Sequence, residues 1–398
     1  MANILGFYIV EKYFRKNHFW PTSTGFRGLA PFTLIIINIL WGIYSLIIEI
    51  TNFKANFVKL LFYVEFILLA SLCLWGNLEL VRNKRHLLNM IDLLSDFNEF
   101  GVPERIQFVD KILKIILKSI NYGGSFVVHL ASYLVMFQDD CVIDQNFKNC
   151  LVHQFYVPLN LNHWEATLIM LFQIYSFTIM VIIMLFGIVL YWYSVELLVI
   201  RINNLNEMLD NITLTKNKKM NYKVLRPLIM YYQKIVRMFR FASSYYVRFL
   251  VPIKVCCSLV LTTSITEFVI TKDLINLIII IANFLGILIC YSIAERFTTL
   301  ANTVSIAIYN LNWFDADVST RNDVLLLLTT CQKPLVIQTP LFMAVSHVAV
   351  AQGLYLLQLD TKSYKLKILK NTSSFNKPPS NTCLFSTYFP SITSSNQY

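Results

Sequence analysis

The sequence predicts an all-α, polytopic membrane protein with seven transmembrane helices and a cytoplasmic amino terminus. Hydrophobic residues make up 56% of the 398-residue chain and charged residues only 14%, against about 45–50% and about 25% in soluble proteins. The apolar residues gather in long runs, and most Lys and Arg residues lie in alternate segments between these runs. Such a composition needs a second apolar environment beside the protein core, which a lipid membrane supplies.

The apolar runs define seven spans, because a helix needs about 20 apolar residues to cross the hydrocarbon core of a bilayer. In chain order they cover residues 29–50, 57–80, 123–137, 166–195, 249–270, 274–293 and 335–357. The third run is short. Two further segments, 87–120 and 225–238, carry apolar residues at helical spacing with charges between them. These segments either extend the neighbouring spans or form separate interfacial helices.

The orientation follows from the distribution of Lys and Arg. The amino-terminal segment and the segments after the second, fourth and sixth spans carry 24 of these residues, whereas the opposite loops carry four. The more basic side of a membrane protein faces the cytoplasm. The first span is then an uncleaved anchor, and the carboxyl terminus lies outside. This topology is the reverse of that of a G-protein-coupled receptor.

The sequence gives no support for several classes of function. The net charge of +11 does not indicate nucleic-acid binding, because the basic residues lie in short loops rather than on one polar domain. The eight cysteines show no zinc-binding spacing. Neither a phosphate-binding loop, a His-Glu-x-x-His motif nor a Gly-x-Ser-x-Gly motif occurs. We therefore expect no enzyme, no metal site and no cofactor.

Ionisable side chains within the apolar runs are the first candidates for function, because charge is costly inside a membrane. They are Glu65, His129, Lys254, Glu267 and His347. These groups indicate either ligand or ion contacts, as in a proton-coupled transporter, or hydrogen-bonded side chains and side chains that reach the membrane surface.

Polar and aromatic side chains in the outer halves of the second to sixth spans are the second group of candidates. A pocket for a small, largely apolar molecule is lined mainly by apolar and aromatic residues. The candidate ligand-binding residues are Phe66, Ser132, Tyr133, Met136, Gln173, Tyr175 and Phe177. The alternative for each is ordinary helix packing or lipid contact.

The predicted outer segments carry two modification candidates. Cys141 and Cys150 share the loop between the third and fourth spans, where an oxidising compartment permits a disulfide. Asn371 begins an Asn-Thr-Ser sequence in the carboxyl-terminal tail, which is a glycosylation acceptor if the tail lies outside.

The most specific stretch follows the sixth span. It contains Tyr309 and Trp313, then an apolar run at 325–328, then Gln332, Lys333 and Pro334 directly before the seventh span. This arrangement resembles the carboxyl-terminal signature of insect odorant receptors, which pairs a Tyr–Trp segment with a Gln-Lys/Arg-Pro step. The inverted seven-helix topology of that family also agrees with the count of basic residues.

The resemblance implies an odorant-binding subunit that assembles with a shared odorant receptor coreceptor into a heterotetrameric, ligand-gated, non-selective cation channel in the plasma membrane of olfactory sensory neurons. It implies the following parts: a cytoplasmic segment 1–28, helices with an outer odorant pocket in 29–300, an intersubunit anchor in 301–338 and a pore helix in 339–358. The anchor residues would be Tyr309, Trp313, Gln332, Lys333 and Pro334. The pore residues would be Leu341, Val345 and Val348.

The chain departs from the family pattern after Gln352. A tail rich in Ser, Thr, Asn and Lys follows in 359–398, which predicts disorder. A splice variant or an altered exon boundary would produce such a departure, and the residues that follow would then carry no family function. The alternative functions are a gustatory receptor of the same superfamily and, from a different class, a secondary transporter, which would show inverted repeats.

Overall fold

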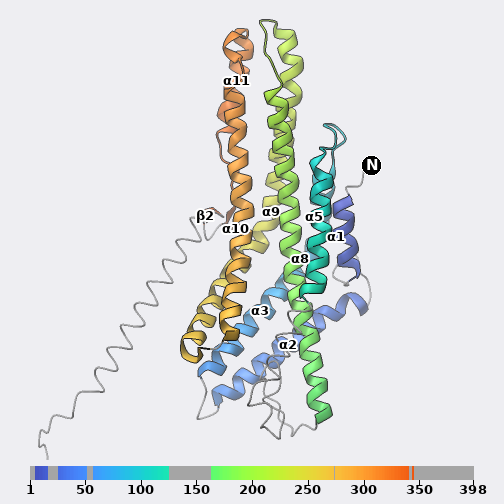
Figure 1. Cartoon of the computed structure of the whole chain (residues 1–398), viewed down its shortest axis with the longest axis vertical. Helices are drawn as coiled ribbons and strands as arrows, with labels where there is room; N and C mark the ends of the chain where they lie inside the picture. The colour runs from blue at the N-terminus through green and yellow to red at the C-terminus, as the bar shows by residue number, and fades with distance from the viewer. Residues whose placement is uncertain are drawn as a thin grey trace, which may run out of the picture. The chain divides into compact units, whose positions relative to one another are not determined.

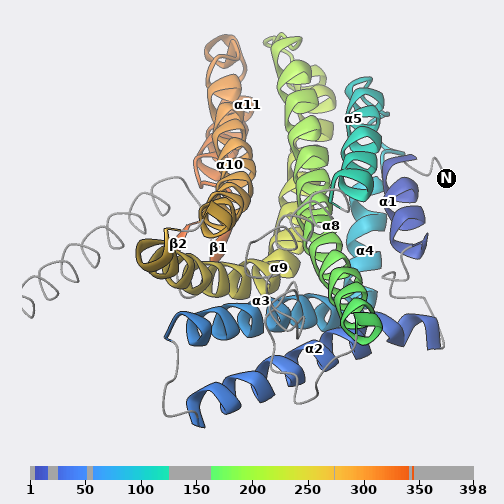
Figure 2. The same ribbon diagram turned by 60° about the horizontal axis from the view of Figure 1, so that its bottom comes forward.

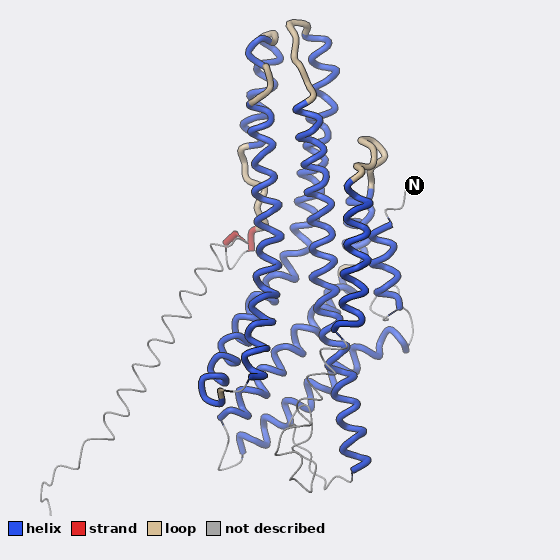
Figure 3. Tube along the Cα trace, viewed as in Figure 1, coloured by secondary structure: helices blue, strands red, loops and turns tan. Residues whose placement is uncertain are grey.

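Helices make up almost all of the described structure (Figure 1). The computed structural model describes residues 5–16, 26–51, 57–124, 163–272, 274–339 and 343–344. In this part of the chain the helices are joined by turns and loops, and the only strands are two of two residues each, as Figure 3 shows. The all-α fold class predicted from the sequence is therefore confirmed.

The described helices, in chain order, are α1 (Leu5–Lys16), α2 (Phe26–Thr51), α3 (Phe57–Arg82), α4 (Lys84–Ser95), α5 (Arg105–Ser119), the π-helix η1 (Ile120–Gly124), α8 (His163–Asp210), α9 (Lys218–Thr271), α10 (Leu274–Tyr309), the 3-10 helix η3 (Trp313–Asp315) and α11 (Val318–Cys331). Figures 1 and 2 show α2 and α3 lying along each other, with α8, α9 and α10 packed side by side.

Five of the described helices are long and apolar enough to cross a membrane, namely α2, α3, α8, α9 and α10. They correspond to the first, second, fourth, fifth and sixth predicted spans. Of the predicted third span only residues 123 and 124 are described, where they end the π-helix η1. The rest of that span, with His129, lies outside the described residues.

Two of these helices are much longer than a membrane crossing requires. α8 has 48 residues and α9 has 54, which gives about 70 and 80 Å at 1.5 Å per residue, against about 30 Å of hydrocarbon. The segment 225–238 is part of the uninterrupted α9, so here the alternative of an extended span holds. The Asn217 side chain caps this helix by accepting from the backbone N–H of Lys219 at 3.1 Å.

The segment 87–120 instead forms separate helices, so for it the other alternative holds. A turn at Asn83 ends α3, and α4 and α5 follow with residues 96–104 between them. Gly101 adopts φ +75° in this connection, a left-handed conformation that side chains with a Cβ rarely take. The apolar faces of α4 and α5 bury Leu87, Met90, Leu113 and Leu117 completely, which explains the helical spacing seen in the sequence.

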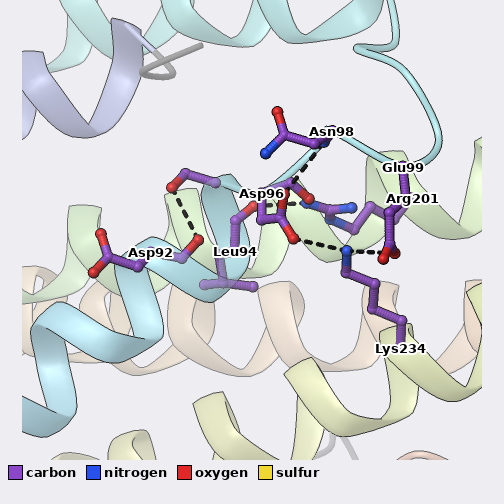
Figure 4. A network of polar contacts seen from close by, with 8 residues as sticks. Asp92, Leu94, Asp96, Asn98, Glu99, Arg201 and Lys234 are labelled. Atoms are coloured by element: carbon purple, nitrogen blue, oxygen red, sulfur yellow. Dashed lines mark hydrogen bonds and ion pairs between the residues drawn. The ribbon is translucent and has the colours of Figure 1, made fainter. Parts of the chain in front are cut away.

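A network of polar contacts ties the α4–α5 connection to α8 and α9 (Figure 4). Arg201 of α8 is completely buried. Its Nη2 atom donates to the backbone carbonyls of Leu94 at 2.9 Å and Asp96 at 2.8 Å, and its guanidinium carbon lies 3.6 Å from the centre of the Phe97 ring. Lys234 of α9 donates to the carboxylates of Asp96 and Glu99, each at 2.8 Å.

The ion pair of this network makes stability depend on pH. The hydrogen bond from Lys234 is the main reason why the pKa of Asp96 lies below its usual value of 3.8. A depressed carboxyl pKa adds stability above the unfolded-state pKa and loses it as the pH falls through the folded-state value. We expect Asp96→Asn to lower the melting temperature slightly at pH 6–7. The difference from the wild type should persist down to about pH 3.8 and shrink below it, as the pH approaches the lower folded-state pKa of Asp96; an equal difference at every pH would contradict this assignment.

The loop before η3 connects the end of α10 with the turn between α8 and α9. Asn312 bonds twice to the backbone of Leu214, accepting from its N–H at 2.8 Å and donating to its carbonyl at 3.0 Å. Closer to the middle of the helices, Arg296 of α10 forms a bidentate ion pair with Glu196 of α8, at 2.9 and 3.2 Å. The ion pair joins α10 to α8, and the bonds of Asn312 join the segment after α10 to the connection between α8 and α9.

The start of the predicted seventh span, residues 335–357, is not helical where the structure describes it. Strand β1 (Gln338–Thr339) pairs antiparallel with strand β2 (Met343–Ala344). Because the sequence places Pro340 directly after β1, residue 339 is disfavoured from helical backbone angles, and Pro340 itself has no N–H to donate. The remainder of that predicted helix, with Leu341, Val345, His347 and Val348, lies outside the described residues.

Candidate ligand cavity

A cavity of about 360 Å³ lies where α3, α8, α9 and α10 meet. Its size falls within the range of about 300–1,000 Å³ that is usual for small-molecule sites. Its wall is mainly aromatic and aliphatic and includes Phe62, Phe66, Leu69, Phe177, Met180, Ile183, Met184, Phe249, Ile253, Ile279 and Ile287. A compact, largely apolar molecule therefore fits the chemistry of this wall.

Two glycines keep the cavity open. Gly187 of α8 and Gly286 of α10 both line it, and a Cβ atom added at either position would meet nothing within 4 Å. A side chain at these positions therefore has open space around its Cβ. Gly42 on α2 contrasts with them, because a Cβ there would approach Ile67 Cγ1 to 3.1 Å.

A few polar groups interrupt the apolar wall. Glu65 of α3 and Glu267 of α9 line the cavity and are only 5% and 4% exposed. Ser264 donates from Oγ to Glu65 Oε1 at 2.7 Å. Asn283 of α10 also lines the cavity, with its Nδ2 donating to the carbonyl of Ile279 at 3.0 Å. A mostly apolar pocket with a few placed polar groups is the common form of a ligand site.

Three free thiols also line the cavity: Cys73, Cys257 and Cys290. Each is buried, and Cys73 donates to the carbonyl of Met180 at 3.7 Å. Buried thiols behave mainly as small apolar groups. Within the described residues, no group of three or more His, Cys, Asp or Glu side chains is arranged to hold a metal ion. The thiols therefore belong to the apolar wall.

The candidate ligand residues fall into three sets. Phe66 and Phe177 line the cavity. Gln173 is completely buried and Tyr175 is 60% exposed, and neither is among the cavity-lining residues, so their role in binding stays a prediction. Ser132, Tyr133 and Met136 lie outside the described residues.

The candidate anchor residues lie at the surface of the chain. Tyr309, Gln332, Lys333 and Pro334 are exposed. Trp313 is half-buried, donates from Nε1 to the carbonyl of Tyr309 at 3.2 Å, and stacks on Phe314 with ring centres 4.2 Å apart. This part of the structure therefore presents apolar and aromatic side chains at its surface. Cys141, Cys150 and Asn371 lie outside the described residues.

Sequence reasoning missed several cavity residues. Gly187, Gly286 and the three thiols lie in uniformly apolar runs, where nothing in the pattern separates a cavity wall from helix packing. Glu65 and Glu267, in contrast, stand out in the sequence as charges within apolar runs, and the structure places both of them at the cavity.

Comparison with solved structures shows a shared fold. The chain is similar to the insect olfactory receptor OR5 from Machilis hrabei, with 14% identity, a TM-score of 0.66, and coverage of 91% of this chain and 97% of that chain. The same receptor in complex with eugenol gives 13% identity and a TM-score of 0.69 with the same coverage. Comparison with curated protein sequences gives no match.

Comparison with protein families gives the decisive match. The family described as 7tm odorant receptor matches residues 56–352. This range contains α3, α8, α9 and α10, which form the cavity, and the segment from Tyr309 to Pro334 that carries the resemblance. The five long apolar helices agree with a multi-pass membrane protein. The chain therefore belongs to the 7tm odorant receptor family.

Proposed function

We propose that this chain is the odorant-binding subunit of a ligand-gated, non-selective cation channel that it forms with an odorant receptor coreceptor. The complex lies in the plasma membrane of olfactory sensory neurons, with the amino terminus of the chain in the cytoplasm. The odorant occupies the cavity between α3, α8, α9 and α10. The observation that carries this proposal is that cavity, with its apolar wall and its few buried polar groups.

The charge distribution supports the orientation. The side that carries 24 Lys and Arg residues includes the connection between α4 and α5 and the ends of α9 and α10 that α11 contacts. Positive charge favours the cytoplasmic side of a membrane. The cavity lies between the apolar parts of its helices, within reach of a ligand that partitions into the membrane.

The exposed apolar residues at the ends of α10 and α11 support assembly. Apolar side chains on a free surface mark an interaction site when they lie together. The exposed ones here are Ile306, Tyr309, Phe314, Val318, Leu325 and Leu326. They lie in the same part of the molecule as the anchor residues that the family resemblance indicates.

Electrical recording tests the function directly. Cells that express the chain together with a coreceptor should give currents when exposed to a panel of volatile molecules. The currents should persist when G-protein signalling is blocked, because the ligand opens the channel itself. Currents abolished by the block would contradict the channel, and volatile-independent uptake of a solute without any current would favour a transporter.

Substitution at the exposed end of α11 tests the assembly surface. Leu326 is 70% exposed in the single chain, so Leu326→Asp should leave the folded subunit intact but place an unpaired charge in an apolar contact. We expect at least a tenfold decrease in co-purification with the coreceptor. Phe108→Asp on α5, where the side chain is 61% exposed, is the matched control and should co-purify as the wild type does. Equal losses for both variants would contradict this surface.

A further inference from the structure

A proline lies inside α9 at the edge of the cavity. Pro252 is part of this 54-residue helix, and its neighbours Phe249 and Ile253 line the cavity. In a regular α-helix the carbonyl of residue 248 accepts from the N–H of residue 252, but proline has no N–H. The carbonyl of Arg248 therefore lacks its usual donor within the helix. Sharp bends of helices occur at such positions, and Figure 2 shows that the part of α9 beside α3 turns away from the part alongside α8.

Trp75 of α3 supplies the missing donor. Its Nε1 donates to the carbonyl of Arg248 at 3.4 Å, and the same side chain lines the cavity. The side chain of Arg248 is also held at this end of α3, because its Nη1 donates to Asn83 Oδ1 at 2.9 Å and lies 3.6 Å from Glu79 Oε1. Both the backbone and the side chain of Arg248 are thus held to this end of α3, one turn before Pro252.

The bond from the indole can respond to what fills the cavity. Its length of 3.4 Å exceeds the usual range of about 2.7–3.2 Å, so a small movement of the ring is enough to break it. Trp75 is 44% exposed, so packing alone does not fix the ring. A molecule that packs against the indole restricts its movement. Occupancy of the cavity therefore favours the closed bond.

We propose that Trp75 is the residue through which a molecule in the cavity acts on α9. With the bond from Nε1 to the Arg248 carbonyl closed, the two parts of α9 move together. With the bond broken, a displacement beside the cavity is absorbed at Pro252. This inference rests on the proposed function, since it takes the cavity as the odorant site and the current as its output. It assigns Trp75 and Pro252 as positioning residues that determine how strongly a bound molecule opens the channel.

A double-mutant cycle tests the proposal. Trp75→Phe keeps an aromatic ring in the cavity wall but removes the N–H. Pro252→Ala restores the donor within the helix, so that the Arg248 carbonyl no longer depends on the indole. Cells express each variant with a coreceptor and are exposed to 1-hexanol, 2-heptanone, benzaldehyde and eugenol. Trp75→Phe should lower the maximal current roughly fivefold in the wild-type background and change it by less than about 1.5-fold in the Pro252→Ala background.

Two controls repeat the same kinds of substitution elsewhere. Pro227→Ala removes the other proline inside α9, and Trp164→Phe changes a residue of α8 that is 78% exposed. Neither residue is among those that line the cavity. Trp75→Phe should keep its full effect in the Pro227→Ala background, and Trp164→Phe should leave the maximal current unchanged. Surface labelling corrects each current for the amount of protein at the membrane.

Thermal unfolding follows the same cycle without any ligand or current. In detergent, Trp75→Phe should lower the melting temperature by about 1–2 °C, as expected for the loss of one hydrogen bond in a large protein. The same substitution should not lower it in the Pro252→Ala background. Equal decreases in both backgrounds would overturn the inference, even if Pro252→Ala by itself carries no current.

The outcomes separate this inference from the proposed function. If the volatiles evoke currents but Trp75→Phe lowers them equally in both backgrounds, or not at all, the role of Trp75 is wrong and the odorant cavity stands. If no volatile evokes a current from the wild type, the proposed function fails and this inference fails with it.

Discussion

Arg201→Ala is expected to lower the free energy of unfolding by about 2–4 kcal/mol, because one buried and one partly buried carbonyl lose their hydrogen bonds, at about 1–3 kcal/mol for the buried one and less for the other. The carbonyls belong to Leu94 and Asp96, and both lie where the chain leaves α4. The substitution also leaves an empty volume beside the Phe97 ring, which adds to the cost. A loss of this size is a large part of the total stability of about 5–15 kcal/mol that is typical of a folded protein.

The loss of stability is measured on the detergent-solubilised protein, expressed as a fluorescent fusion. Samples are heated, and the decrease of the size-exclusion peak with temperature gives the melting temperature. Lys234→Met is the matched control in the same network. Its partners Asp96 and Glu99 are partly exposed to solvent, so its cost should stay within about 0–1 kcal/mol. Arg201→Lys should be intermediate, because a lysine cannot reproduce the planar donor geometry of a guanidinium. An alanine variant as stable as the wild type would refute the anchoring role of Arg201.

Gly286→Leu is expected to abolish responses to large odorants while the protein stays folded. The new side chain adds four carbons to a position where a Cβ meets nothing within 4 Å and where the cavity has about 360 Å³ of space. Ligands that fill the cavity should lose at least tenfold in potency, whereas the smallest ligands should change little. Removing a glycine from a helix interior also favours the helix, by roughly 0.5–1 kcal/mol for alanine.

A series of substitutions separates occlusion from misfolding. Gly286→Ala should keep the ligand range of the wild type, since one methyl group fits the open space. Gly187→Leu, on the opposite helix α8, should act as Gly286→Leu does. Gly42→Leu should instead lower the melting temperature, because its side chain would collide with Ile67. If Gly286→Leu leaves the potency of every ligand unchanged, the cavity is not the odorant site.

Five of the seven spans correspond to described helices, because a run of about 20 apolar residues has few alternatives to a membrane helix. The lengths of α8 and α9 could not be predicted in the same way. Beyond their apolar runs these helices carry the mixed polar and apolar pattern of any amphipathic helix. The same pattern in 87–120 belongs to two shorter helices, and the contacts of Arg201 with the residues between them are not visible in the local sequence.

The residues that line the cavity could also not be predicted from the local sequence. A helix that is apolar on every side gives no periodicity that separates the cavity face from the lipid face. Phe177 and Tyr175 were equally good candidates, yet only Phe177 lines the cavity. Asn312 lies within the family signature, but its partner Leu214 is 98 residues away. Charged residues were the exception, because Glu65 and Glu267 differ so clearly from their surroundings.

The uninterrupted course of α8 and α9 has a mechanical consequence. Each helix passes the cavity and continues without a break to the end of the bundle where Asn312 contacts Leu214, between α8 and α9. A rod of about 70–80 Å that tilts at one end must displace the other, and the ion pair between Glu196 and Arg296 couples α10 to that displacement. A displacement of these helices at the cavity would therefore also move the end of the bundle where α11 packs against α9 and α10.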